Sequence, residues 1–203
     1  MTSEPGVWGD DRRVRIGLLG GSFNPAHAGH RHVAEWALRR LGLDQVWLMV
    51  SPGNPLKPAR GMAPFARRLA SARAIADGRR IIATDIEARL GTRYTVDTLE
   101  QLHRRFPRAE FVLLMGADNL SQLPRWKRWR RIAREVPIAV LPRPGETRRA
   151  LSGQAAHALA RHRRRPEALL TGGGEEHAPW SLIPAREHPA SATAIRATQD
   201  RMV

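Results

Sequence analysis

Two glycines and two histidines near the N-terminus have the residue types and spacing that phosphate binding requires. Residues 14–32, VRIGLLGGSFNPAHAGHRH, form an apolar run that reaches Gly20 and Gly21, a short loop, and then His27 and His30 at the start of a helical pattern. Glycine lets the backbone approach a ligand closely, and the following helix directs free N–H groups and its positive dipole end at an anion. Residues three apart on a helix share a face, so both imidazoles are predicted to face one bound anion.

Two alternatives for these histidines are weaker. A lone histidine is usually a surface or helix-capping residue, but the glycine turn that precedes this pair favours a phosphate site. A metal site made of His27, His30 and His32 is possible by residue type. Positions i, i+3 and i+5 do not converge on one helix face, however, so the spacing disfavours it.

Alternating apolar segments predict the elements that must hold this turn. We expect strands at 14–19, 45–51, 80–84, 110–115, 137–141 and 180–184, and helices at 30–41, 63–77, 95–106, 150–164 and within 188–199. Strands that alternate with helices indicate an α/β fold, here a Rossmann-like, doubly wound, mostly parallel sheet with helices on both faces. In such a sheet the ligands bind at the carboxyl ends of the strands.

The length of 203 residues favours one domain with a short C-terminal helical part. Residues 1–13 are expected to be a flexible tail, and residues 14–203 the domain itself. The pattern weakens over residues 146–179, which lack the apolar positions for a core of their own. We therefore interpret that segment as an insertion or a lid rather than as a second domain.

Composition restricts the class of protein. The absence of cysteine excludes disulfides and thiolate chemistry and suits a reducing compartment. The N-terminus lacks the layout of a signal peptide, and no apolar run reaches the roughly 18 residues of a membrane span. The sequence thus predicts a soluble cytoplasmic protein that has no membrane partner.

The net charge of +15 raises the possibility of nucleic-acid binding. Only Lys57 and Lys127 are lysines among the 34 basic residues, so the excess is almost entirely arginine. Runs such as RWKRWRR at 125–131 are typical of solvated helix faces, which makes a dedicated polynucleotide site a minor alternative. A positive field also raises the encounter rate of an enzyme with phosphorylated substrates.

Two motifs carry a family resemblance. Residues 20–30, GGSFNPAHAGH, resemble the GGxFDPxHxGH signature of the HxGH nucleotidylyltransferases, and residues 191–196, SATAIR, are similar to their ISSTxIR motif. With residues 116–120 and the pair at 94–95, the sequence is most similar to the bacterial nicotinate-nucleotide adenylyltransferases, a family of NAD biosynthesis. The resemblance spans residues 14–196. Asn24 stands where the family more often has Asp, and Ala192 where it more often has Ser.

The resemblance implies adenylyl transfer from ATP to nicotinate mononucleotide, which gives deamido-NAD and pyrophosphate. A phosphate oxygen of the mononucleotide attacks the α-phosphorus of ATP, so catalysis depends on alignment and charge stabilisation rather than on a protein nucleophile. His27 and His30 would donate hydrogen bonds to phosphate oxygens, and Arg196 would hold the β- and γ-phosphates. Mg²⁺ would arrive with ATP, without protein side chains as ligands.

The resemblance also assigns binding residues. Tyr94 and Thr95 would recognise the nicotinate carboxylate through their backbone, and Trp126 would stack on the pyridine ring. Trp126 and Trp129 could instead pack into the core, and Asp118 could cap the helix that follows it. The full expectation for ATP is Gly20, Gly21, Ser22, Phe23, Gly29, Gly116, Asp118, Ser191 and Thr193, and for the acceptor nucleotide it is Lys57, Tyr94, Thr95, Trp126 and Arg143.

Other functions remain open from the sequence. The same reaction could act on nicotinamide mononucleotide or phosphopantetheine, or a related reaction could use CTP. Enzymes of the phosphopantetheine branch usually carry Thr at the position of His27, which counts against that acceptor. A non-catalytic nucleic-acid-binding protein is supported by charge alone, and its binding would weaken steeply with salt. The oligomeric state is not readable from the sequence.

Overall fold

A six-stranded parallel sheet organises the chain, and its strand order is β3-β2-β1-β4-β5-β6. The computed structural model describes residues 4–53, 61–170, 178–188, 190, 192, 195 and 196. All five strand pairs are parallel, as the alternation of elements predicts. The strands are β1 (Arg15–Gly21), β2 (Gln45–Val50), β3 (Ile81–Thr84), β4 (Glu110–Gly116), β5 (Ile138–Leu141) and β6 (Trp180–Leu182).

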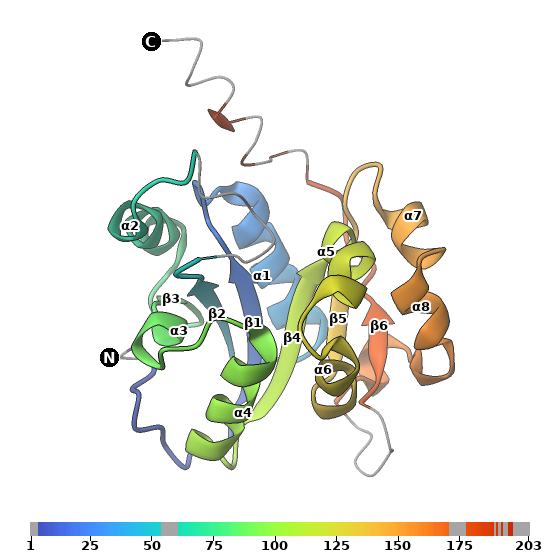
Figure 1. Cartoon of the computed structure of the whole chain (residues 1–203), viewed down its shortest axis with the longest axis horizontal. Coiled ribbons are helices and arrows are strands. Elements are labelled where there is room, and N and C mark those ends of the chain that lie inside the picture. Colours follow the sequence, from blue (N-terminus) through green and yellow to red (C-terminus); the bar gives the residue numbers. More distant parts are fainter. Residues whose placement is uncertain are drawn as a thin grey trace.

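Helices cover both faces of the sheet, so the predicted doubly wound arrangement is confirmed (Figure 1). Helices α1 (Ala28–Arg40) and α2 (Phe65–Ile75) bury their apolar residues in one core. The other core takes α3 (Ile86–Arg89), α4 (Thr95–Arg105), α5 (Ala117–Gln122), α6 (Trp129–Glu135), α7 (Thr147–Leu151) and α8 (Gln154–Ala158). Short 3₁₀ turns lie at η1 (Leu123–Arg125), η2 (Ala160–His162) and η3 (Pro166–Ala168).

Strand β1 is the centre of this arrangement. Ile16 and Leu18 point into one core and Leu19 into the other, as the two-residue period of a strand requires. A side chain at Gly17 would meet Leu114 Cδ1 at 2.7 Å. The packing of the core that contains Leu19, on the side of α1 and α2, therefore needs glycine there. The chain leaves β1 toward β2 and later returns to β4 on the other side, which makes the β1/β4 edge the switch point where ligands bind in such sheets.

One predicted helix is wrong in detail, and a basic run interpreted as a helix face is interrupted. Residues 150–164 are not one helix, because the chain breaks between α7 and α8 and Gly153 caps α8 in an extended conformation. Likewise Arg128, at a φ of 51°, separates η1 from α6. The sequence also gave no sign of α3, whose four residues are too few for a helical period.

Residues 146–179, expected from the sequence to be an insertion or a lid, share a core with α4 and α5 where they are described. Ala150, Ala155, Ala156 and Leu159 are buried in the same core as α4 and α5, and the indole N–H of Trp180 donates to Leu159 O at 2.7 Å. The segment needs few apolar side chains because α7 and α8 pack against α5 instead of forming a separate core. Residues 171–177 lie outside the described residues.

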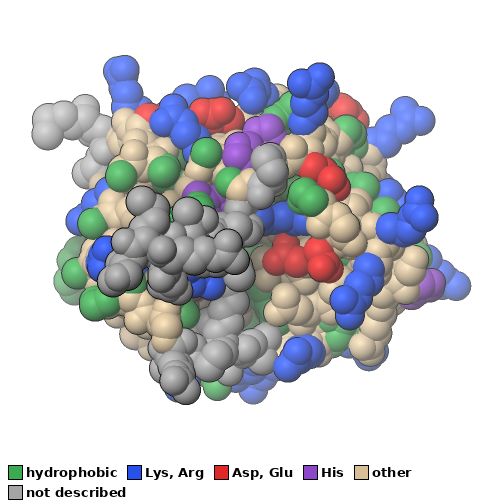
Figure 2. All heavy atoms as spheres, turned by 90° about the horizontal axis from the view of Figure 1, so that it is seen from above, with side chains coloured by type: hydrophobic (Ala, Val, Ile, Leu, Met, Phe, Trp, Pro, Cys, Tyr) green, Lys and Arg blue, Asp and Glu red, His purple; other side chains and the backbone are tan. Residues whose placement is uncertain are grey.

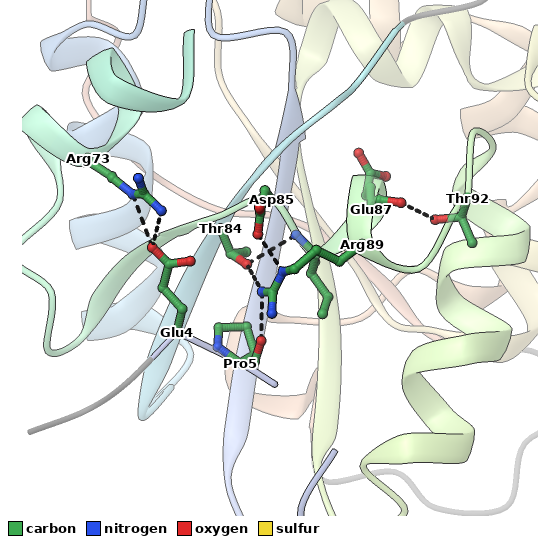
Figure 3. A network of polar contacts seen from close by, with 9 residues as sticks. Glu4, Pro5, Arg73, Thr84, Asp85, Glu87, Arg89 and Thr92 are labelled. Atoms are coloured by element: carbon green, nitrogen blue, oxygen red, sulfur yellow. Dashed lines mark hydrogen bonds and ion pairs between the residues drawn. The ribbon is translucent and has the colours of Figure 1, made fainter. Parts of the chain in front are cut away.

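The N-terminal segment, which the sequence predicts to be a flexible tail, contacts three helices from Glu4 onward, and Figure 3 shows its contacts with Arg73 of α2 and Arg89 of α3. Glu4 pairs with Arg73 of α2 at 2.7 Å, and Arg89 donates to Pro5 O at 2.8 Å. Arg105 of α4 donates to Val7 O at 2.7 Å. Residues 4–7 therefore tie α2, α3 and α4 together along one side. None of the helices in the described part of the chain is long and apolar enough to cross a membrane.

Candidate active site

The turn between β1 and α1 fixes two imidazole rings against each other. His27 is the N-cap of α1, and its Nδ1 accepts a hydrogen bond from the Gly29 N–H at 3.1 Å. His30 Nδ1 accepts from the His27 N–H at 3.2 Å, so the two histidines form a reciprocal capping box. The ring centroids are 3.9 Å apart, which confirms that the pair is brought together. With Nδ1 used as an acceptor, each neutral ring carries its only N–H at Nε2.

The electrostatic environment keeps His27 neutral. Its side chain is buried, and burial lowers its pKa from 6.5 to about 4, with the nearby positive charges of Arg143 and His188 acting in the same direction. Near pH 7 the ring is therefore a neutral hydrogen-bond donor at Nε2 rather than a cation. A neutral donor with a fixed tautomer is suited to stabilise a phosphate oxygen in the transition state.

Two glycines of the predicted ATP site differ in whether the surrounding atoms require glycine. A side chain at Gly29 would meet His27 Nδ1 at 2.9 Å and Ala190 O at 3.2 Å, so glycine there lets the imidazole reach its N–H partner. A side chain at Gly20 would meet only Met49 Cε, at 3.9 Å. Gly20 also has no positive φ, so neither packing nor backbone strain requires glycine there. The open space beside Gly20 is consistent with close approach of a ligand to the backbone.

The loop between β1 and α1 is held by contacts from distant segments. Phe23 is buried and its ring lies 4.8 Å from that of His30. Asn24 accepts from Ala63 N at 3.1 Å and donates through Nδ2 to Gly61 O at 2.9 Å, a donation that an ionised Asp could not make. Arg196 donates to Asn24 O, which places this predicted phosphate-binding residue beside the loop.

A buried arginine of α2, which sequence reasoning missed, clamps the same loop. Arg68 is 3% exposed and donates to Ser22 O at 2.7 Å, to Ser51 O at 2.8 Å and to Ala63 O at 3.0 Å. It thereby joins the ends of β1 and β2 to α2. The alternating Arg and Ala residues of this helix give no periodic signal that would single out one arginine.

Asp118 and Arg143 lie together at the end of β4, on the His27 side of the site. Arg143 Nε is 3.6 Å from Asp118 Oδ1, and a side chain at Gly116 would meet those two atoms at 2.8 and 2.4 Å. Arg143 also contributes to the low pKa of His27. The structure therefore separates Arg143 from the cavity lined by Tyr94 and Trp126, whereas the sequence grouped the three. Asp118 is not the cap of α5, because Gly116 holds the N-cap position without a side-chain bond.

A cavity adjoins the glycine turn and brings together three of the predicted acceptor residues. Tyr94, Thr95 and Trp126 line it, together with Gly20 and Ser22 from the turn. Helix α4 begins at Thr95 with no side-chain cap, so the N–H groups of Thr95 and Val96 have no intrahelical acceptor, whereas Asp97 N–H donates to Tyr94 O at 3.0 Å. The N-cap is Tyr94, and Thr95 is the first helical residue, as the predicted range of 95–106 has it. Trp126 and Trp129 both pack partly against the core, but only Trp126 of the two lines the cavity.

Polar residues of this cavity were missed by sequence reasoning, since they come from short elements without a period. The charge of Lys127 lies 4.5 Å from the centre of the Tyr94 ring and pairs with Asp97 at 2.9 Å. The other missed polar residues that line the cavity are Ser51, Glu87, Arg93, Asn119, Gln122 and Arg125. Three residues predicted to bind substrate, Lys57, Ser191 and Thr193, lie outside the described residues.

His32, the third histidine of the metal site considered from the sequence, contacts residues 186 and 188 near the C-terminus. His32 Nε2 lies 2.8 Å from Arg186 O, and its ring is 5.3 Å from that of His188. His27 and His30 use Nδ1 within their own turn. Within the described ranges, no group of three or more His, Asp or Glu side chains could hold a metal ion.

The site opens on the face that contains the carboxyl ends of the strands. In the view from above, histidine side chains lie near the middle of this face, acidic side chains lie beside them, and Lys and Arg side chains project around the rim (Figure 2). A positive rim of this kind raises the local concentration of anionic substrates.

Comparison with known proteins defines the class and then the family. The model of the family described as "Cytidylyltransferase-like" matches residues 18–198. Among curated proteins, a "Probable nicotinate-nucleotide adenylyltransferase" of Gluconobacter oxydans is 63% identical over 185 residues, covering 90% of this chain and 94% of that protein. A protein of the same name from Gluconacetobacter diazotrophicus is 59% identical over 192 residues, covering 95% and 89%.

A solved structure shows the same fold. Plasmodium falciparum nicotinic acid mononucleotide adenylyltransferase, complexed with NaAD, matches with a TM-score of 0.66 at 16% identity, covering 91% of this chain and 83% of that chain. Fold, motif and family model thus define a cytidylyltransferase-like nucleotidyltransferase. The chain belongs, within that class, to the nicotinate-nucleotide adenylyltransferase family.

Proposed function

We propose that this chain transfers the adenylyl group of ATP to nicotinate mononucleotide, releasing pyrophosphate and forming the deamido dinucleotide of NAD biosynthesis. Membership of the family supports the reaction. The single structural observation that carries it is the pair of imidazoles 3.9 Å apart, in which both Nδ1 atoms accept hydrogen bonds from backbone N–H groups of the turn.

The transfer step needs alignment and charge stabilisation. A phosphate oxygen of the mononucleotide forms a bond to the α-phosphorus of ATP, and the bond to the pyrophosphate oxygen breaks. His27 and His30 donate from Nε2 to oxygens of the reacting phosphates, and Arg196, beside the same turn, binds the leaving phosphates. We assign Gly20, Gly21, Ser22, Phe23 and Gly29 to the ATP side because they build this turn.

Residues at the end of β4 complete the ATP side. We assign Gly116 and Asp118 to the ATP sugar, with Ser191 and Thr193 from the second motif at the phosphates. Arg143 belongs with them rather than with the acceptor, because it lies against Asp118 and close enough to His27 to lower the pKa of that ring. Its guanidinium is suited to contact a phosphate.

The cavity beside the turn takes the acceptor. The uncapped start of α4 at Tyr94 and Thr95 presents backbone N–H groups, which suit a carboxylate. Trp126 offers a flat apolar face for the pyridine ring. Lys57, in the loop that follows β2, is assigned to the acceptor phosphate.

Mg²⁺ belongs to the substrate in this proposal. The described residues hold no cluster of carboxylates or histidines that could form a protein cage for it. We therefore expect the ion to enter on the phosphates of ATP. A cytoplasmic location, favoured by the absence of cysteine, stays a prediction.

Pyrophosphate release tests the proposal. The purified protein is supplied with Mg²⁺ and ATP and, separately, with nicotinate mononucleotide, nicotinamide mononucleotide or phosphopantetheine. We expect rapid release with the nicotinate acceptor and much slower release with the other two. Release with another acceptor instead would retain the phosphate chemistry and contradict the assignment of the cavity. No release with any acceptor would contradict the reaction.

A further inference from the structure

The carboxyl group of Glu87 is a buried acid in the wall of the acceptor cavity, and the transfer step leaves it unused. Glu87 lies on α3, is 8% exposed, and shares the cavity with Tyr94, Thr95 and Trp126. Its side chain points away from the Asp85–Arg89 pair of the same short helix (Figure 3). It therefore belongs to the wall of this cavity rather than to a surface ion pair.

Few groups stabilise the ionised form of the Glu87 carboxyl group. Thr98 Oγ1 donates to Glu87 Oε1 at 3.3 Å, but the same hydroxyl lies 2.9 Å from Thr92 Oγ1 and 3.2 Å from Tyr94 O. A hydroxyl has one hydrogen to donate, so these acceptors compete for it. Glu87 takes part in none of the ion pairs among the described residues. Burial raises its pKa from 4.5 to about 7, against the opposing effect of Thr98.

Among the described residues, the cations that line the cavity form no ion pair with Glu87. Lys127 is paired with Asp97 of α4. The remaining titratable or charged groups that line the cavity are Arg93 and Tyr94 before α4 and Arg125 at the end of η1, and the lining residues of β2 and β4 carry none. An acceptor carboxylate in this cavity would therefore add a second negative charge near a buried carboxyl group.

On the basis of the proposed function, we propose that Glu87 determines acceptor preference through its proton: it is protonated whenever a pyridine carboxylate occupies the cavity, and it can stay ionised with an amide. Two like charges close together in a poorly solvated site disfavour each other, and protonation of one of them relieves the repulsion. The proton comes from solvent. The neutral carboxyl then supplies an O–H donor in place of a negative charge.

The proposal fixes the sign of a pH dependence. Below about pH 7 Glu87 already carries the proton, so the carboxylate acceptor binds without proton uptake. Above that pH each further unit weakens its binding by up to roughly tenfold, because a proton must be taken up. Binding of the amide acceptor requires no such uptake. Both acceptors carry the same ribose phosphate, so the ratio of their KM values cancels the titration of that phosphate.

The test is the ratio of KM for nicotinate mononucleotide to KM for nicotinamide mononucleotide, measured from pH 6 to pH 9. We expect the wild-type ratio to rise above pH 7 by up to roughly tenfold per unit, and the ratio of Glu87→Gln to stay flat. Glu100→Gln is the matched control, because Glu100 lies exposed on α4 and pairs with Arg104 and Arg131. It is expected to follow the wild type.

Two results would overturn the proposal. One is a wild-type ratio that does not change with pH, which needs no variant and is decisive even if Glu87→Gln fails to fold. The other is a folded Glu87→Gln variant whose ratio rises as in the wild type, since Glu87 would then be only structural. Absence of turnover with both pyridine nucleotides in the wild type would instead contradict the proposed function and this inference with it.

Discussion

The β1–α1 turn and the acceptor cavity beside it are built in opposite ways. The turn takes its reactive groups from residues 20–30, and its two imidazoles satisfy their Nδ1 atoms within four residues of each other. The cavity is assembled from β1, β2, α3, α4, β4, α5, η1 and α6, most of which are far apart in the sequence. The reactive groups of the turn therefore come from one local segment, although distant residues such as Arg68 hold its loop, whereas the groups of the cavity come together only when the helices pack on the sheet.

This difference suggests a division of labour. Under the proposed function, the turn presents imidazole N–H donors of fixed tautomer to the reacting phosphates of either acceptor. The cavity presents an uncapped helix start, an aromatic face and a buried carboxyl, which can distinguish one acceptor from another. Substitutions in the turn should lower kcat. Substitutions in the cavity should change KM for the acceptor and the preference between acceptors.

The largest expected effect is at the turn. His30→Ala removes one of the two Nε2 donors, so kcat should fall about 10²- to 10³-fold, the usual loss for one transition-state donor. Pyrophosphate release under saturating substrates measures it. His157→Ala, on an exposed position of α8, is the control and should keep wild-type turnover. Wild-type kcat in a folded His30→Ala variant would remove the histidine pair from the mechanism.

The next effect concerns the stability of the folded protein and its dependence on the ionisation of Glu87. Because Glu87 has a pKa of about 7 when folded and 4.5 as a model group, its contribution to stability is full below pH 4.5 and is lost as pH rises through 7. The loss approaches about 3 kcal/mol at high pH. Glu87→Gln cannot ionise, so its advantage over the wild type should grow from pH 5 to pH 8, by roughly 5–10 °C in Tm.

Thermal unfolding monitored by circular dichroism measures this difference. Glu100→Gln is again the matched control, since its exposed side chain should give no pH-dependent difference in Tm. A constant gap between wild type and Glu87→Gln across this range would show that Glu87 is ionised in the folded protein at both pH values.

A third change separates two tryptophans. Trp126→Ala removes the aromatic wall of the cavity, and stacking on a heterocycle is worth about 1–3 kcal/mol, so KM for the acceptor should rise roughly 5- to 150-fold. Steady-state kinetics at saturating ATP measures it. Trp129→Phe should leave that KM unchanged, because Trp129 packs against the core without lining the cavity. Equal effects of the two changes would favour the alternative in which both are core residues.

The smallest effects are expected at two glycines of β1. Gly17→Ala should cost about 1–3 kcal/mol in the free energy of unfolding, because its methyl group would overlap Leu114 and Leu43, while KM for ATP stays unchanged. Gly20→Ala should leave stability unchanged and raise KM for ATP several-fold. Urea unfolding and initial rates measure the two quantities. The reverse pattern would mean that Gly20 is a packing residue rather than part of the ligand site.

Prediction from the sequence succeeded where contacts are local or periodic. The six strands and the doubly wound sheet follow from apolar runs separated by amphipathic helices, and the histidine pair follows from a spacing of three residues. The sequence could not place Arg143 beside Asp118 rather than in the cavity, because residues 25 apart meet only after β4 and β5 pair. Glu87 and Arg68 were missed for the same reason, since their roles depend on burial that no local pattern shows.

The most direct test of the division of labour is the ratio of kcat/KM for nicotinate mononucleotide to that for nicotinamide mononucleotide in His30→Ala. If the turn only stabilises reacting phosphates, both values fall by the same factor and the ratio stays within about twofold of the wild-type ratio. If His30→Ala changes that ratio by about tenfold or more, the turn takes part in choosing the acceptor, and the separation between the two regions is wrong.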